Sequence, residues 1–219
     1  MKHIKLLKIL PIITALVLLA SCNTQNDEPV YDSYLNFATL ESLYSGGCSF
    51  RVQESNSSSP VILTSTSSLP TNFTVGNRYV IQYSNENAGA YVSGPISLLY
   101  ALTPFGGDAT VATSDSISKL MSDNISVPYI KRIGRWLDVQ AFASVSYQPN
   151  VFGVFVDEAT VKQEYPEAYL GFRTDFSNGS QYVLYGSFNI SPIMGFESAK
   201  GFNLHYKFNN IWKTEKIEF

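Results

Sequence analysis

Cysteines, histidines and clustered acids are the residues through which this chain could perform chemistry. The sequence contains two cysteines and two histidines. Four acids lie close together, namely Asp157, Glu158, Glu164 and Glu167. Paired carboxylates can hydrolyse glycosides or bind Ca²⁺. Glycosidase carboxylates must face each other across a cleft, so acids this close in sequence favour one solvated loop. We therefore expect neither a catalytic nor a metal site there.

Beyond residue 21 the chain has a single histidine, His205, in a segment where apolar and polar residues alternate. One histidine excludes a multi-histidine zinc site and an HExxH helix. A Ser-His-Asp triad would have to use His205, and the sequence has no G-x-S-x-G motif. We expect His205 to be an exposed strand residue without a catalytic role. Cys48 has no histidine near it in sequence, and we expect a small buried hydrophobe rather than a reactive thiol.

The first 22 residues have the pattern of an export signal. Three lysines precede an apolar run over residues 9–20, which is too short to span a bilayer as a helix. The run ends in Leu19-Ala20-Ser21-Cys22, which resembles the lipobox of bacterial lipoproteins. The resemblance implies that residues 1–21 are a signal peptide and that Cys22 carries the lipid. Residues 22–33 are polar, and we expect a flexible tether.

The charge balance limits the partners. Removing a signal that holds three lysines and no acid leaves 12 basic and 18 acidic residues, a net charge of −6. Such a chain repels nucleic acid and anionic head groups, so membrane association would depend on acyl chains. We expect an outer-membrane, lipid-anchored envelope protein, facing the periplasm or the surface, with no nucleic-acid partner and no cofactor.

Two further groups of residues have alternative interpretations. The basic cluster consists of Lys131, Arg132 and Arg135. It could contact phosphate groups of a glycolipid, or it could be a charged strand edge that discourages aggregation. The aromatic candidates are Tyr129, Trp136 and Trp212. They could stack on sugars, although aromatic residues of β proteins more often pack in the core.

Strands must position these residues. Aromatics form 14% of the chain and charged residues 15%, a composition that favours pleated, half-buried segments. Short strands with turn signals predict a small barrel or sandwich over residues 34–113. One short helix follows at residues 116–121, capped by Ser114 or Asp115. Further strands, with a hairpin turn at Asn178-Gly179, predict that residues 114–219 form this helix and an antiparallel β-sandwich.

The order of several short motifs resembles the NigD-like lipoproteins. The matching segments are residues 75–83 (VGNRYVIQY), residues 115–117 (DSI) with Val127, and residues 134–140 (GRWLDVQ). The resemblance implies an all-β chain with an N-terminal OB-like barrel and a C-terminal β-sandwich. It carries over no catalytic residue. The family name derives from a bacteriocin operon, which implies an immunity role. The chain departs from the family in a shorter, serine-rich N-terminal segment.

The sequence therefore predicts a non-catalytic, lipid-anchored envelope protein that binds a macromolecule or a glycan. Two alternatives remain open. One is a glycan-degrading enzyme that uses the acids between positions 157 and 167. The other is a structural subunit of an outer-membrane assembly.

Overall fold

A computed structural model describes residues 32–85, 89–120, 125–144, 149–174 and 181–219. The predicted signal peptide, Cys22, most of the tether and the Asn178-Gly179 turn lie outside these residues. None of the helices within the described ranges has both the length and the apolar character needed to cross a membrane.

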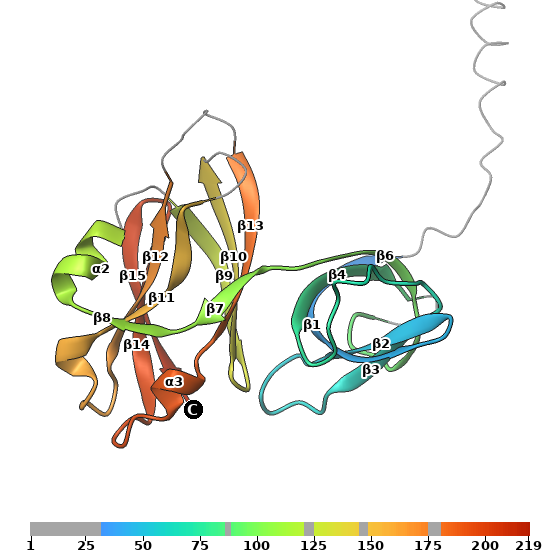
Figure 1. Cartoon of the computed structure of the whole chain (residues 1–219), viewed down its shortest axis with the longest axis horizontal. Helices are drawn as coiled ribbons and strands as arrows, with labels where there is room; N and C mark the ends of the chain where they lie inside the picture. Colours follow the sequence, from blue (N-terminus) through green and yellow to red (C-terminus); the bar gives the residue numbers. More distant parts are fainter. Residues whose placement is uncertain (1–31, 86–88, 121–124, 145–148, 175–180) are drawn as a thin grey trace, which may run out of the picture. The chain divides into compact units, whose positions relative to one another are not determined.

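The first half of the chain forms one six-stranded sheet with the order β5-β3-β2-β1-β4-β6. Its strands are β1 (Ser33–Tyr44), β2 (Gly47–Val52), β3 (Val61–Ser65), β4 (Arg78–Ser84), β5 (Gly94–Pro95) and β6 (Ser97–Leu102). All neighbours are antiparallel except β3 and β5. The sheet curls around a core that includes Leu40, Phe50, Tyr79 and Tyr83 (Figure 1). The hydrogen-bonded ladder stays open, with β5 and β6 at its edges, whereas the NigD-like resemblance implied a barrel.

The hairpin between β1 and β2 depends on two glycines. Gly46 has φ +89°, a backbone conformation that disfavours residues with a Cβ atom. A Cβ atom on Gly47 would lie 2.3 Å from the carbonyl oxygen of Ser65 on β3. The turn and the close approach of β3 therefore both require glycine.

The second half of the chain is a sandwich of two sheets. One sheet has the order β7-β13-β10-β9 and the other β15-β14-β12-β11-β8. The strands are β7 (Phe105–Asp108), β8 (Thr110–Ala112), β9 (Ile125–Ile133), β10 (Trp136–Ser144), β11 (Val151–Asp157), β12 (Glu167–Arg173), β13 (Gln181–Asn189), β14 (Gly201–Phe208) and β15 (Ile211–Glu218). The two sheets face each other (Figure 1) and enclose a second core with Leu137, Phe172, Phe188 and Phe202 at its centre.

The strand pairing confirms the all-β fold and corrects two details of the prediction. The sandwich is mixed rather than antiparallel, because β7–β13, β8–β11 and β12–β14 are parallel pairs. Strands β7 and β8 also hydrogen-bond within the sandwich, although the sequence placed residues 34–113 in the first domain. These strands contain few apolar residues, so their sequence alone does not reveal which sheet they join.

The predicted helix is present as α2 (Ser114–Leu120), which buries Ile117 against β11 and β12. Its cap differs from the prediction. The hydroxyl of Thr113 accepts a hydrogen bond from the Ser116 backbone N–H at 3.3 Å, whereas the Ser114 hydroxyl donates to Asp157. Two short helices were not predicted, η1 (Glu158–Thr160) and α3 (Ser191–Met194).

The buried phenol of Tyr83 predicts a loss of stability in alkaline solution. The hydroxyl donates to the Ala90 carbonyl and accepts from the Asn36 amide. Burial raises the pKa of Tyr83 to about 12. In the unfolded chain the phenol ionises near pH 10, so its contribution is complete below pH 10 and is lost between pH 10 and pH 12. The expected loss is about 2–3 kcal/mol.

Denaturant unfolding between pH 8 and pH 12 measures this effect. The Tyr83→Phe variant should have a flatter profile above pH 10 than the wild type. Identical alkaline slopes in the two proteins would show that this phenol does not carry the effect.

Candidate functional site

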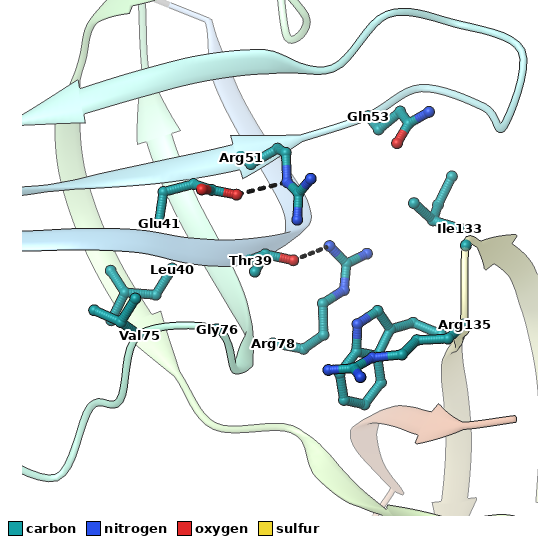
Figure 2. A pocket seen from close by; sticks show the side chains of 12 residues that line it. Thr39, Leu40, Glu41, Arg51, Gln53, Val75, Gly76, Arg78, Ile133 and Arg135 are labelled. Carbon is teal, nitrogen blue, oxygen red and sulfur yellow. Dashed lines mark hydrogen bonds and ion pairs between the residues drawn. The ribbon is translucent and has the colours of Figure 1, made fainter. Parts of the chain in front are cut away.

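A cleft of about 420 Å³ lies beside the first sheet and the turn between β9 and β10 (Figure 2). Its lining comes from β1, β2, the start of β4 and the β9–β10 hairpin. The lining residues are Thr39, Leu40, Glu41, Arg51, Gln53, Val75, Gly76, Arg78, Ile133, Gly134, Arg135 and Trp136. This volume is within the range of small-molecule sites.

Backbone hydrogen bonds fix the side of the cleft that the first sheet provides. The Leu40 N–H donates to the Asn77 carbonyl at 3.0 Å, and the Gly76 N–H donates to the Leu40 carbonyl at 2.8 Å. Gly76 has φ +88°, which allows the chain to turn back onto β1 before β4 begins. As a result, Arg78 enters β4 opposite Thr39.

Asn56 holds the β9–β10 turn. Its side-chain carbonyl accepts from the Gly134 N–H at 2.7 Å, and its amide donates to the Arg132 carbonyl at 3.1 Å. Gly134 has φ +57°, and the Arg135 carbonyl accepts from the Ile190 N–H at 2.8 Å. A loop of the first half and the chain after β13 therefore set the position of Arg135.

One residue of the cleft lining, Arg78, belongs to a buried ion pair. Arg78 on β4 donates to both carboxylate oxygens of Asp138 on β10, and the two residues are 7% and 1% exposed. Arg78 also donates to the Thr39 hydroxyl at 3.3 Å, and the Ser187 hydroxyl donates to Asp138 at 2.7 Å. Burial raises the pKa of the Asp138 carboxyl, while the guanidinium acts in the opposite direction. Because arginine stays charged at neutral pH, the ion pair joins β4 to β10.

Two more guanidinium groups stand at the cleft, one from each half of the chain. Arg51 forms an ion pair through Nε with Glu41 at 2.6 Å, and both side chains are partly exposed. The Arg135 guanidinium lies over the Trp136 ring, 4.9 Å from its centre. The lining thus has three cations and one carboxylate, which suits the binding of an anion.

Within the described ranges, no three His, Cys, Asp or Glu side chains gather in a way that could hold a metal ion. The cleft lining itself contains no histidine or cysteine. General acid–base catalysis there would have to use Glu41, which is paired with Arg51.

The structure places the four predicted acids away from the cleft lining. Asp157 caps η1 and accepts from the Ser114 hydroxyl. Glu164 pairs with Lys200, and Glu167 binds Asn203 and His205. Glu158 lies in η1. Three of the four carboxylates therefore have separate structural partners.

His205 is less exposed than predicted. Its ring stacks on Tyr169 at 4.6 Å, and its nitrogens contact Glu167 on β12 and the Thr214 hydroxyl on β15. A hydroxyl, an imidazole and a carboxylate thus lie in a row across three strands. Cys48 is fully buried, as expected, with its sulfur 3.6 Å from the Ser67 carbonyl.

The basic and aromatic residues selected from the sequence do not form one group in the structure. Arg135 and Trp136 line the cleft, whereas Lys131 lies over the Tyr91 ring and Arg132 over the Phe219 ring. Tyr129 stacks on Phe37, with ring centres 6.4 Å apart. Trp212, on β15, is 47% exposed and does not occupy a core position.

Sequence reasoning missed Arg51, Arg78 and Asp138. Asp138 alternates with core residues of β10, a pattern that is typical of a solvent-facing side chain. The first half of the chain covers that face instead. An acid in the middle of an otherwise apolar strand was the available signal, but its partner lies 60 residues away.

Comparisons with solved structures identify proteins of the same fold. A protein of unknown function from Bacteroides vulgatus matches with a TM-score of 0.65 and 15% identity, over 86% of this chain and 91% of its own. A candidate lipoprotein from Bacteroides fragilis matches with a TM-score of 0.57 and 13% identity, over 85% of this chain and 98% of its own.

A NigD-like immunity protein from Bacteroides caccae matches with a TM-score of 0.57 and 12% identity, over 84% of this chain and 93% of its own. No family model and no curated protein matches the sequence. At these identities the likeness concerns the fold, and it supports the NigD-like resemblance at that level: the chain has the all-β fold of a NigD-like immunity protein.

Proposed function

We propose that this chain is a lipid-anchored, non-catalytic envelope protein of the NigD-like type that binds a glycan or a macromolecular partner. The observation that carries the binding role is the cleft. It is concave, it draws residues from both halves of the chain, and arginines rather than acid–base pairs provide its charge.

The fold likeness to a candidate lipoprotein and to a NigD-like immunity protein supports the envelope assignment. The lipobox at residues 19–22 supplies an anchor by acylation. The net charge of −6 after signal removal favours partners other than nucleic acid. An immunity role is the narrower form of this proposal, and it predicts that deleting the gene sensitises the cell to a co-encoded toxin.

Lipidation at Cys22 is the first expected result. The full chain, expressed in a bacterial host and purified from membranes, should lose residues 1–21 and gain the mass of a diacylglycerol thioether on Cys22. The Cys22→Ala variant should lack this mass and leave the membrane fraction, while Cys48→Ala should behave like the wild type. A mature terminus elsewhere, or an unmodified Cys22 thiol, would contradict the anchor.

The absence of catalysis is tested with the same preparation. We expect no hydrolysis across a broad polysaccharide panel. Turnover that disappears in Glu167→Gln or Asp157→Asn would replace the binding function with a glycosidase. A stoichiometric protein recovered from detergent extracts, without glycan binding, would favour a structural subunit of an envelope assembly.

A further inference from the structure

We propose that the cleft binds an oxyanion, a carboxylate or a phosphate, carried on a sugar-sized polar molecule, and that Arg51 and Arg135 hold it. This inference rests on the proposed binding function and specifies the chemistry of its ligand. The contacts that already fix each guanidinium group support this choice of ligand.

A contact with an aromatic ring holds the Arg135 guanidinium at the cleft. The guanidinium carbon lies 4.9 Å from the centre of the Trp136 ring, which is a cation–π contact. A guanidinium has five N–H donors, and its contact with the ring leaves most of them available to a ligand. The backbone at this position is also fixed, through the Arg135 carbonyl and the Gly134 N–H. The donors of Arg135 are therefore presented in a defined orientation.

An ion pair holds Arg51, and its terminal nitrogens also remain available to a ligand. Its contact with Glu41 uses Nε, the nitrogen nearest the backbone. The two terminal nitrogens form another edge of the guanidinium, which can also bind a carboxylate or a phosphate in a bidentate manner. Figure 2 shows the Arg51, Arg78 and Arg135 side chains around one space. Arg51 comes from β2, and Arg135 comes from the β9–β10 turn.

Arg78 contributes charge rather than donors. The hydrogen bonds of Arg78 go to Asp138 and Thr39, and the residue is 7% exposed. Asp138 balances the charge of Arg78, and Glu41 balances one of the other two arginines. One cationic charge remains at the cleft in a body of net charge −6. A cationic site on an acidic surface favours a ligand with few charges over a polyanion, which the rest of the surface repels.

The remaining lining suits a sugar. The Thr39 hydroxyl and the Gln53 amide can exchange hydrogen bonds with ligand hydroxyls, and Val75 and Ile133 provide apolar contact. A volume of about 420 Å³ accommodates one or two sugar rings rather than a long segment of polymer. An acidic sugar or a sugar phosphate meets both requirements.

Trp136 reports binding directly. The chain has two tryptophans, and Trp212 is exposed on β15. In full-length Trp212→Phe protein, purified in detergent, tryptophan fluorescence arises from Trp136 alone. We expect saturable changes with methyl β-glucuronide and with glucose 6-phosphate, and little change with methyl β-glucoside at equal ionic strength. The first two probes distinguish a carboxylate from a phosphate.

Neutral variants test the roles of the arginines by calorimetry. Arg51→Gln and Arg135→Gln should each weaken binding of the better anionic probe at least tenfold, and the double variant should abolish it. Lys162→Gln, which removes an exposed cation outside the cleft lining, should bind like the wild type. Circular dichroism should show that each variant is folded.

Different experimental results would overturn the oxyanion site and the proposed function. Equal binding of methyl glucoside and methyl glucuronide, unaffected by the arginine variants, would overturn the oxyanion site and leave glycan binding intact. No response to either anionic probe would also overturn the oxyanion site. Loss of Cys22 lipidation, or polysaccharide turnover, would overturn the proposed function instead.

Discussion

Replacing Asp138 with asparagine is expected to lower the free energy of unfolding by about 3–5 kcal/mol. The substitution keeps the size of the side chain but leaves the Arg78 cation buried without a counter-charge. Arg78 and Asp138 are 7% and 1% exposed, so water can replace little of the lost interaction. Urea unfolding at pH 7 measures the loss.

Two controls separate this effect from an ordinary change of charge. Glu41→Gln breaks the partly exposed Arg51–Glu41 pair and should cost about 0–1 kcal/mol. The double variant Arg78→Met/Asp138→Leu removes both buried charges and should recover most of the stability that Asp138→Asn loses. If Asp138→Asn costs no more than Glu41→Gln, the ion pair does not join β4 to β10 as described.

Gly201→Ala is expected to destabilise the sandwich by about 3 kcal/mol or more. A Cβ atom at this position would lie 2.1 Å from the Ile217 carbonyl oxygen and 3.0 Å from the Glu218 Cα. Both neighbours are backbone atoms of β15, which pairs with β14 from Gly201 to Phe208. Relief of the clash would require the strands to separate, which would disturb the burial of Phe202.

Gly195→Ala provides the matched comparison. Gly195 has φ −80°, which alanine adopts readily, and a Cβ atom there would meet its nearest neighbour at 3.5 Å. The melting temperature of the Gly195→Ala variant should stay within a few degrees of the wild type. The lower entropy of the unfolded variant offsets small changes in packing. Equal melting temperatures for the two alanine variants would contradict the close strand approach at Gly201.

The sequence predicted those parts of the fold that depend on local patterns. Alternation indicated the strand around His205, which is β14, and the helix predicted at residues 116–121 is present as α2. Pairing over long distances was not predictable in this way. β7 joins β13 although some 80 residues separate them, and no local signal in Phe105–Asp108 indicates that partner.

The candidate site was predicted in part. Arg135 and Trp136 were singled out as a basic and an aromatic residue, and both line the cleft. Arg51 and Arg78 had no distinguishing spacing, because they become neighbours only when β1 pairs with both β2 and β4. Similarly, Glu167 and His205 were considered separately, whereas the pairing of β12 with β14 brings them into contact.

Guanidinium NMR signals test the binding site most directly. The Nε–H resonances of Arg51, Arg78 and Arg135 should be followed in the full chain during titration with methyl β-glucuronide and glucose 6-phosphate. We expect saturable shifts at Arg51 and Arg135 with a common affinity. We expect little change at Arg78, whose donors already bind Asp138 and Thr39. Unchanged Arg51 and Arg135 signals with both ligands, or shifts confined to arginines outside the cleft, would contradict the proposed oxyanion site.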